Sequence, residues 1–436
     1  MAVHSHASRA WTSFGVVSMA LAVLVPTSGT TNSHCSQAPT GIELPKGFCS
    51  TVFADDLGFA RHISTTPAGD VFVILDKVRS QPPTGAIIAL RDTDSDGVAD
   101  RREGFGPTAG DDIEWRDGYL YYSTASHVAR YALALGELVP AAEPEVVVGP
   151  FVRFETPEHD SKPFVLTGES DLFLHIGAPS NSCQRENRRA ASAGVNPCPL
   201  LENTAGIWRF DAKKLLQLPR DGKRVATGVR HTLGLSVHPR SGTLFAVMHG
   251  RDLLHLNWPE VFSEKENADL PSDELLEITD NPDYGWPYCY HDPKRSTRVL
   301  APEYGGNGER VGDCSRYRLP ALAIPAHSAP SDLMFYDGRM FPPHYRHGAF
   351  VAFHGGWGRA PLEQRGYSVA FLPFDDAFKP AGSIEPFATG FAGVTPIREP
   401  RYARFRPVGL AIGPDGALFV ADSKVGRVWR ITYSEL

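Results

Sequence analysis

Acidic residues at regular spacing form the sharpest chemical motif in this chain. Side chains that can offer oxygen ligands occupy positions 1, 3, 5, 9 and 12 of a twelve-residue stretch: Asp92, Asp94, Asp96, Asp100 and Glu103. Gly97 stands at position 6, where calcium-binding loops turn sharply. The preceding residues 87–90 favour a strand, so the motif predicts a structural calcium site in a β context. A solvated acidic turn is the alternative.

His159 is the histidine, of 16 in the chain, whose position best suits catalysis. It follows Glu158 and precedes a predicted strand, on a connecting loop of the kind on which functional sites are built. An imidazole there is suited to act as a general base near neutral pH. A single histidine is more often a surface or hydrogen-bonded core residue, and that alternative stays open on this pattern alone.

Arg404 and Arg406 are interleaved with aromatic residues just before the last predicted hairpin. In an extended chain they point to the same face, where they would form a clamp for carboxylates or phosphates. A solvated surface strand is the alternative. No GxGxxG or P-loop motif follows a predicted strand, and the sequence has no Gly-x-Ser-x-Gly elbow. Nicotinamide, nucleotide and serine-hydrolase chemistry are therefore disfavoured.

The composition restricts the fold class and the partners. Of 436 residues, 42% are hydrophobic, 41 are Gly and 36 are Pro. This content argues against both a helical bundle and a disordered chain. A net charge of −7 argues against a nucleic-acid partner. The sequence therefore indicates a soluble, turn-rich, all-β protein.

A recurring hairpin organises the chain. Six times, a short strand with alternating apolar residues is followed by a turn and a second strand, and these units begin at Ile63, Ile113, Val165, Leu235, Leu333 and Leu410. Their number and uneven spacing predict an all-β, six-bladed β-propeller with long inter-blade loop insertions. The longest insertion, residues 251–330, is expected on the functional face rather than in a sheet. Residues 50–54 are expected to pair with residues 428–433 and close the ring; an eight-stranded sandwich is the alternative.

The N-terminus predicts export. Residues 1–29 have the features of a secretory signal peptide, with Arg9 ahead of an apolar run from Phe14 to Val25. That run is too short to span a bilayer. The sequence therefore predicts a single domain over residues 30–436, a periplasmic or secreted location, and no stable membrane insertion after cleavage. An uncleaved membrane anchor or a lipoprotein is the alternative.

Six cysteines agree with an oxidising compartment. They fall into three local pairs, and proximity alone suggests the pairings Cys35–Cys49, Cys183–Cys198 and Cys289–Cys314. None of them has the spacing of a zinc site. The cysteines are therefore expected to form disulfides.

Four blocks of sequence resemble one known family, the soluble glucose/sorbosone dehydrogenases that use pyrroloquinoline quinone (PQQ). The blocks are Tyr284-Gly-Trp-Pro287 within residues 281–292, Ala326-His-Ser-Ala-Pro330, His354-Gly-Gly-Trp-Gly-Arg359, and the closing residues 406–416. The resemblance covers approximately residues 44–433. It implies a six-bladed propeller, in agreement with the hairpin count.

The resemblance implies roles for residues that match the family's motifs. His159 matches the catalytic histidine that takes the proton of the sugar's anomeric hydroxyl while a hydride passes to the quinone. Arg230 matches an arginine beside the quinone carbonyls, where it would stabilise developing charge. Gly250 and Arg251 match positions whose backbone carbonyls help to hold an active-site calcium.

Other matched residues imply contacts with the cofactor itself. Arg404 and Arg406 match an arginine pair that grips the PQQ carboxylates, and Arg359 matches a basic residue with a similar task. His231 replaces a common asparagine and can still hydrogen-bond PQQ. Lys162 stands where relatives often have arginine, and Ile324 lies nearest to the position of an aromatic residue that stacks on the quinone in some members.

The resemblance implies an exported dehydrogenase that oxidises an aldose or related sugar at the anomeric carbon, with PQQ and calcium as cofactors. The sequence has no CxxCH haem motif, so electrons would pass to a separate cytochrome or quinone. Two alternatives stay open. The first is a propeller of this family that binds a carbohydrate or a protein without turnover, and the second is a calcium-dependent, lactonase-like hydrolase.

Overall fold

The computed structural model describes residues 40–76, 85–154 and 158–434. The chain divides into a unit of Met1–Ser33 and a unit of His34–Leu436 that holds every described residue. The predicted signal peptide, residues 1–29, lies outside the described residues and stays a prediction. Among the residues described, no helix combines the length and the apolar character needed to cross a bilayer.

Six antiparallel, four-stranded sheets form the core of the described residues. The first three sheets contain β2 (Ala60–Thr65), β3 (Val71–Leu75), β4 (Ile87–Arg91) and β5 (Arg101–Phe105); β6 (Ile113–Arg116), β7 (Tyr119–Ser123), β8 (Val128–Ala132) and β9 (Glu145–Val148); and β10 (Phe164–Thr167), β11 (Asp171–Ile176), β12 (Gly206–Asp211) and β13 (Lys223–Thr227). The next two contain β14 (Thr232–Val237), β15 (Leu244–Met248), β16 (Asp273–Ile278) and β19 (Leu322–Ile324); and β20 (Pro330–Phe335), β21 (Gly348–Phe353), β22 (Ser368–Pro373) and β23 (Glu385–Ala388). The last contains β24 (Pro407–Ile412), β25 (Leu418–Asp422), β26 (Val428–Tyr433) and β1 (Phe48–Ala54).

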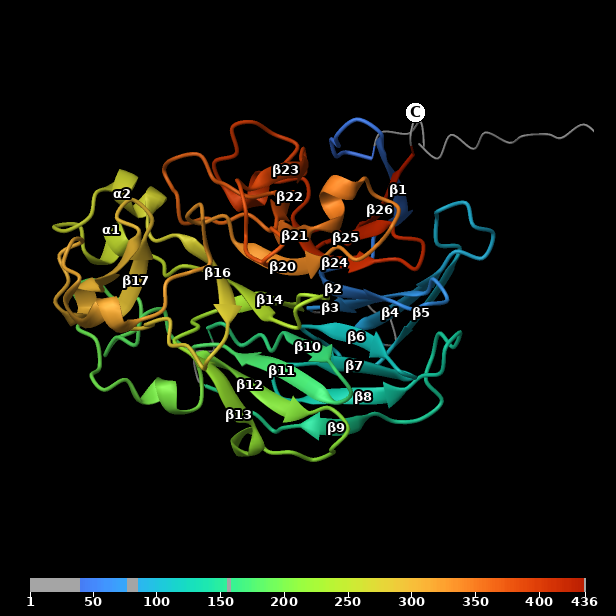
Figure 1. Ribbon diagram of the computed structural model, residues 1–436, viewed down its shortest axis with the longest axis horizontal. Helices are drawn as coiled ribbons and strands as arrows, with labels where there is room; N and C mark the ends of the chain where they lie inside the picture. The colour runs from blue at the N-terminus through green and yellow to red at the C-terminus, as the bar shows by residue number, and fades with distance from the viewer. Residues whose placement is uncertain (1–39, 77–84, 155–157, 435–436) are drawn as a thin grey trace, which may run out of the picture. The chain divides into compact units, whose positions relative to one another are not determined.

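The sheets are the blades of a closed six-bladed propeller. The innermost strands β2, β6, β10, β14, β20 and β24 contact one another in that order, and β24 returns to β2; Figure 1 shows them gathered around one centre. Each predicted hairpin forms the two inner strands of one blade. The predicted closure is also confirmed, because β1 pairs with β26 in the sixth sheet. The sandwich alternative is wrong.

All six innermost strands run in the same direction along the central axis, because each blade starts with its inner strand. Their first residues therefore gather at one end of the ring, together with the residues that follow the second strand of each blade. We call this end the entry face. It receives His231 ahead of β14, His249 after β15, His354 after β21 and Arg406 ahead of β24.

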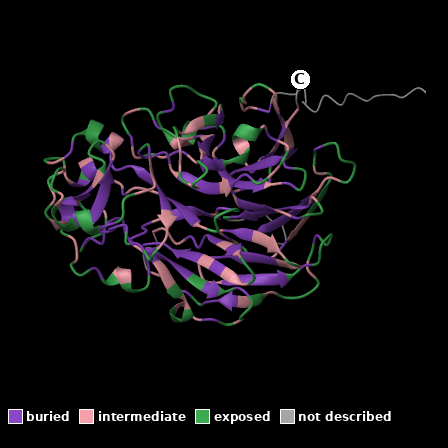
Figure 2. Cartoon of the chain, viewed as in Figure 1, coloured by how far each residue is buried: buried purple, intermediate pink, exposed green. Residues whose placement is uncertain are grey.

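The blades stay together through apolar packing and a few buried ionic contacts. Every residue of β3, β15 and β21 is buried, because neighbouring blades cover both faces of each sheet (Figure 2). Asp112 Oδ2 accepts a hydrogen bond from the backbone N–H of Phe164 in the next blade. Burial alone would lower the pKa of His62, but Asp112 and Asp332 outweigh that effect and raise it to about 9. A charged cluster thus lies at the centre of the ring and ties several blades together.

The long insertion differs in part from the prediction. Residues 251–330 were expected to lie outside the sheet, but β16 and β19 belong to the fourth blade, which would otherwise have only two strands. The rest of the insertion contains α1 (Leu254–Asn257), α2 (Glu264–Asp269), β17 (Cys289–Asp292) and β18 (Thr297–Leu300). Arg298 of β18 donates two hydrogen bonds to the buried Glu274 of β16, which fastens the insertion to the blade.

Two predicted disulfides are confirmed. Cys183 bonds to Cys198 and Cys289 bonds to Cys314. The proposed partner of Cys49, Cys35, lies outside the described residues, so the third pairing stays a prediction.

Candidate active site

His159 lies on the connection between β9 and β10, with its backbone in the left-handed region at φ 51°. Its Nδ1 lies 2.8 Å from the carbonyl oxygen of Ala178. A carbonyl can only accept, so Nδ1 carries the proton and Nε2 keeps its lone pair. Burial and the positive charge of Arg230 hold the pKa of His159 well below its usual range. The residue is therefore a neutral imidazole ready to take a proton.

The His159 backbone conformation depends on a close contact with Gly177. A Cβ built on Gly177 would lie 2.1 Å from the His159 carbonyl oxygen. Only glycine permits this approach, so Gly177 allows the loop to place the imidazole beside His231.

Two further histidines continue from His159 across the entry face. The ring centroids of His159 and His231 are 4.5 Å apart, and those of His231 and His249 are 4.6 Å apart. His249 Nε2 lies 2.8 Å from the Pro330 carbonyl oxygen. His231 Nδ1 is buried and has no hydrogen-bond partner among the described residues. Burial and the neighbouring His159 lower the pKa of His231, so it is neutral as well.

Arg230 is the best-anchored cation at this site. Its Nε and Nη2 donate to the carbonyl and side-chain oxygens of Asn181, and Nη1 donates to the Gly250 carbonyl at 3.0 Å. Asp252 Oδ2 pairs with both Arg230 and Arg188. Burial opposes the charge of Asp252, but these two guanidinium groups outweigh it and lower the pKa of that carboxyl. Asp252 is therefore ionised, and Arg230 is held in one orientation.

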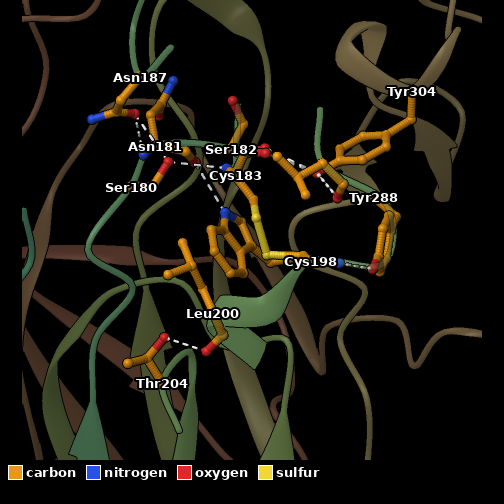
Figure 3. The surroundings of a disulfide bond; sticks show 12 residues. Ser180, Asn181, Ser182, Cys183, Asn187, Cys198, Leu200, Thr204, Tyr288 and Tyr304 are labelled. Atoms are coloured by element: carbon orange, nitrogen blue, oxygen red, sulfur yellow. Dashed lines mark hydrogen bonds between the residues drawn. A yellow bond between two sulfur atoms is a disulfide. The ribbon is translucent and has the colours of Figure 1, made fainter. Parts of the chain in front are cut away.

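Asn181 joins these groups to the disulfide-closed loop. Its side chain accepts from Arg230 Nη2 and from the backbone N–H of Asp252, and it donates to the Asp252 carbonyl. Trp286, from the Tyr-Gly-Trp-Pro block, donates its indole N–H to the Asn181 carbonyl. Figure 3 shows Asn181 beside Ser180 and Asn187, close to the Cys183–Cys198 bond. The disulfide therefore stabilises the loop that positions Arg230.

A cavity of about 530 Å³ opens at His159. Arg61, Asp111, His159, Ser161 and His231 lie in its wall. Burial raises the pKa of Asp111 to about 6, against the opposing charges of Arg61 and Lys162. We call this cavity the funnel; it is the space in which a substrate can reach the His159 imidazole.

One of the two proposed calcium carbonyls, that of Gly250, lies beside Arg230. The Gly250 carbonyl already accepts a hydrogen bond from that guanidinium, so a calcium ion would have to share this oxygen. The Arg251 side chain points elsewhere and forms a buried ion pair with Glu303. A carboxylate that sequence reasoning missed, Asp252, follows directly in the chain.

The three arginines proposed to hold carboxylates lie in different places. Arg406 is half-buried on the entry face, where its Nε donates to the His354 carbonyl. Arg404 is exposed and packs against Gly393, in the loop after the outermost strand of the fifth blade. Arg359 donates to the carbonyls of Glu363 and Ala268 and pairs with Asp269, so it fastens α2 to the fifth blade.

Lys162 and Ile324, the two remaining positions that differ from the family pattern, are buried residues that contact other parts of the protein. Lys162 is buried, and its Nζ donates to the Asp160 carbonyl at 2.6 Å. Ile324 is buried in the apolar core between the fourth and fifth blades. Neither side chain offers a surface on which a quinone could stack.

The acidic motif forms the loop between β4 and β5, away from the funnel. Carboxylate oxygens of Asp92, Asp94 and Asp96 lie within 4.8 Å of one another. Asp100 instead hydrogen-bonds the Thr93 hydroxyl, and Glu103 lies on β5, 3.5 Å from Arg101. Three of the five proposed ligands therefore converge in the structure.

Sequence reasoning missed several residues of the site: Arg61, Asp111, Asn181, Arg188, His249 and Asp252. None of them belongs to a local motif with recognisable spacing. The sequence feature that could have identified them is their position relative to the predicted hairpins. Most of them lie just outside the inner two strands of a blade, where the loops of the entry face begin.

The lowered pKa of His159 predicts the acid side of the pH profile. A base must be unprotonated, and the ordinary histidine pKa is about 6.5. We expect kcat/KM to show no His159 protonation step as pH falls through 6.5, and to lose activity from that step only at lower pH. The profile is to be measured in the native protein and in Asp111→Asn, because Asp111 titrates in the same cavity with a pKa of about 6. A step at 6.5 that persists in Asp111→Asn would contradict the expectation.

Six blades close a ring whose entry face carries a neutral histidine and an anchored arginine, the arrangement that the resemblance to the soluble PQQ-dependent sugar dehydrogenases implies. A family model described as TrAA12-like matches residues 42–434, and the chain belongs to that family. The expectation of family and fold is therefore confirmed.

Individual relatives are distant. A pyrroloquinoline quinone-dependent pyranose dehydrogenase from Coprinopsis cinerea is 24% identical over 260 residues, which cover 52% of this chain and 34% of that protein. An uncharacterized Borreliella burgdorferi protein is 27% identical over 214 residues, 49% of each chain. The matches thus span about half or less of the curated relatives' own length.

Solved structures share the fold. The calcium structure of a Trichoderma reesei protein of Carbohydrate-Active Enzymes Family AA12 superposes with a TM-score of 0.72 at 17% identity, over 92% of this chain and 100% of that chain. The holo form of the Coprinopsis cinerea pyranose dehydrogenase PQQ domain gives 0.70 at 17% identity, over 91% and 99%.

Proposed function

We propose that this protein is a PQQ-dependent sugar dehydrogenase that oxidises an aldose or related sugar at the anomeric carbon. The observation that carries the proposal is His159: its Nδ1 is bound to a carbonyl, its pKa is lowered, and it lies in the wall of the funnel. The family membership and the holo structure of a relative with the same fold support it.

The residues present fit an anionic planar cofactor. Two buried donor or acceptor atoms in the funnel wall, Arg61 Nε and His231 Nδ1, have no hydrogen-bond partner among the described residues. Buried polar atoms without partners are rare, and a ligand that supplies the partners removes that cost. Arg230 and Arg406 add positive charge nearby. PQQ bound there would supply the two-electron acceptor for the hydride.

The protein's own residues would remove the proton and stabilise the developing charge. His159 Nε2 takes the proton of the anomeric hydroxyl, while Ala178 holds the tautomer that keeps this atom free. Arg230 stabilises negative charge that develops beside it. Its hydrogen bonds to Asn181, Gly250 and Asp252 keep the guanidinium in place as that charge develops. The reaction removes a hydride and a proton from the sugar and yields a lactone.

Calcium is proposed at two places. The Gly250 and Arg251 carbonyls would hold one ion near Arg230, and the loop of Asp92, Asp94, Asp96, Asp100 and Glu103 would hold a structural one. The convergence of three carboxylates supports the second site. Electrons would leave to a separate acceptor, and the disulfides agree with an extracytoplasmic location.

Reconstitution tests the proposal. Protein stripped with a chelator is given PQQ, calcium, or both, and dye reduction is followed with a panel of aldoses. We expect turnover only when both are present. Tight PQQ binding without turnover on any sugar would favour the non-catalytic binding propeller, and lactone hydrolysis without PQQ would favour the hydrolase. Absence of PQQ binding would overturn the proposal.

A further inference from the structure

Glu158, the residue before His159, belongs to a charged network that extends away from the funnel. Its Oε1 accepts hydrogen bonds from Asn187 Nδ2 at 2.7 Å and from Arg188 Nε at 2.6 Å. Its Oε2 has no hydrogen-bond partner among the described residues, so both contacts act through one oxygen. The Glu158 side chain is 20% exposed and that of Arg188 is 28% exposed. This partly buried, charge-assisted contact holds the His159 segment more firmly than an exposed ion pair would.

Arg188 binds a second carboxylate with the other end of its guanidinium. Its Nη2 donates to Asp252 Oδ2 at 3.2 Å, and the same oxygen accepts from Arg230 Nη2 at 3.0 Å. One planar guanidinium thus joins two carboxylates, one next to the proposed base in sequence and one in contact with the proposed charge-stabilising cation. The fixed shape of that group sets how far apart the two carboxylates lie.

The loop that carries Arg188 is itself held in place. The Cys183–Cys198 bond closes it, and the Arg188 backbone N–H donates to Gln184 Oε1 at 3.0 Å. The Arg188 backbone lies in the left-handed region at φ 59°, which a residue with a side chain keeps when its surroundings stabilise it. Asn187 Oδ1 accepts from the backbone N–H of Asn181 at 3.1 Å (Figure 3). The loop is therefore a rigid support for the guanidinium.

We propose that Arg188 is a positioning residue shared by the base and the charge-stabilising cation of the site. Through Glu158 it holds the segment that carries His159. Through Asp252 it holds the guanidinium of Arg230. Arg188 lies outside the funnel wall, so it acts through these carboxylates and not on the substrate. The inference rests on the proposed sugar oxidation and adds the residue that fixes the spacing of its two groups.

Three variants in one loop test the inference. Arg188→Met removes the charge and the donors but keeps a long side chain. Arg188→Lys keeps the charge, but one ammonium group cannot reproduce the fork that reaches two carboxylates. Arg189→Met is the matched control, because Arg189 is exposed and pairs with the exposed Glu186.

The first measurement is the pKa of His159, followed by NMR in the PQQ-free, histidine-labelled protein, with His159→Ala to identify the signal. The charged or titratable groups around this imidazole are Arg188, Arg230, Asp252, His231 and, in the funnel wall, Arg61 and Asp111. Arg188→Met should raise the pKa of His159 toward its ordinary range, because a positive charge is lost and Asp252 loses one of its two cationic partners. Arg188→Lys and Arg189→Met should leave this pKa near its native value.

The second measurement is steady-state kinetics of the reconstituted protein with a dye acceptor. Arg188→Met should lower kcat about 10- to 100-fold, because small displacements of reacting groups are costly, while KM for the sugar stays within a few-fold. Arg188→Lys should lose several-fold in kcat, and Arg189→Met should lose none. The double variant Glu158→Gln/Arg188→Met should be no slower than Arg188→Met, because both substitutions remove the same contact.

Native kcat together with a native His159 pKa in Arg188→Met would overturn the inference. Losses that multiply in the double variant would also count against it, because Glu158 and Arg188 would then act independently. If Arg188→Met fails to fold, native kcat in Arg188→Lys would reject the role of the fork. If the native protein oxidises no sugar, the dehydrogenase proposal fails, whereas the His159 titration still decides whether Arg188 controls that imidazole.

Discussion

Replacement of His159 by alanine should lower kcat of the reconstituted protein by about 10²–10⁴-fold, the usual contribution of a positioned general base. Among the described residues of the funnel wall, the His159 imidazole is the group whose proton is fixed on one nitrogen by a carbonyl and whose pKa is lowered by burial and by Arg230. The loss should fall on kcat and kcat/KM together, because proton removal belongs to the transition state and not to substrate binding. Steady-state kinetics with a dye acceptor measures both values.

Two controls show whether the loss is chemical. His344→Ala removes an exposed histidine that pairs with Glu385 on the fifth blade and is outside the funnel wall, and it should leave kcat unchanged. PQQ affinity of His159→Ala, measured by fluorescence titration, should stay within a few-fold of the native value. A His159→Ala protein that binds PQQ normally and turns over at the native rate would reject the assignment.

Replacement of Arg230 by lysine should lower kcat/KM by about 10²–10³-fold, comparable to the loss of one preorganised charge-stabilising group. Lysine keeps the positive charge but cannot reproduce the planar fork that donates to Asn181, Gly250 and Asp252 at once. Asp252 and the Asn181 carbonyl would then lose donors in a buried setting. The free energy of unfolding should fall by about 1–3 kcal/mol as a result.

The matched control for this substitution is Arg209→Lys. Arg209 forms an exposed ion pair with Asp171 across two strands of the third blade, so the change should alter the free energy of unfolding by less than about 0.5 kcal/mol and leave kcat/KM unchanged. Chemical denaturation and steady-state kinetics of both variants give the comparison. If Arg230→Lys retained native kcat/KM, the guanidinium would have a structural role only.

Most of the fold could be predicted from local patterns in the sequence. The alternation of apolar residues around six turns identified the inner hairpin of every blade, because strand periodicity and turn chemistry depend on neighbours in sequence. Two of the disulfides followed from proximity in sequence, whereas the closure of β1 on β26 followed from the need to pair the exposed edge strands of the ring. Residues 273–278 and 322–324 were missed as blade strands, because the long inserted segments between them hide the repeat.

The sequence by itself determined the class of fold and the family and named His159 as the candidate catalytic base, since each is carried by a local motif or repeat. Only the tertiary structure decided how the site is built: Asn181, Arg188 and Asp252 converge on Arg230 because three loops that are distant in sequence meet where inner strands begin. It also separated Arg404 from Arg406: their alternation is the same, but Arg406 reaches the loop after β21 and Arg404 packs against the loop after β23 of the same blade. Alternation sets the face on which a side chain lies, whereas the packing of neighbouring blades sets which groups it reaches.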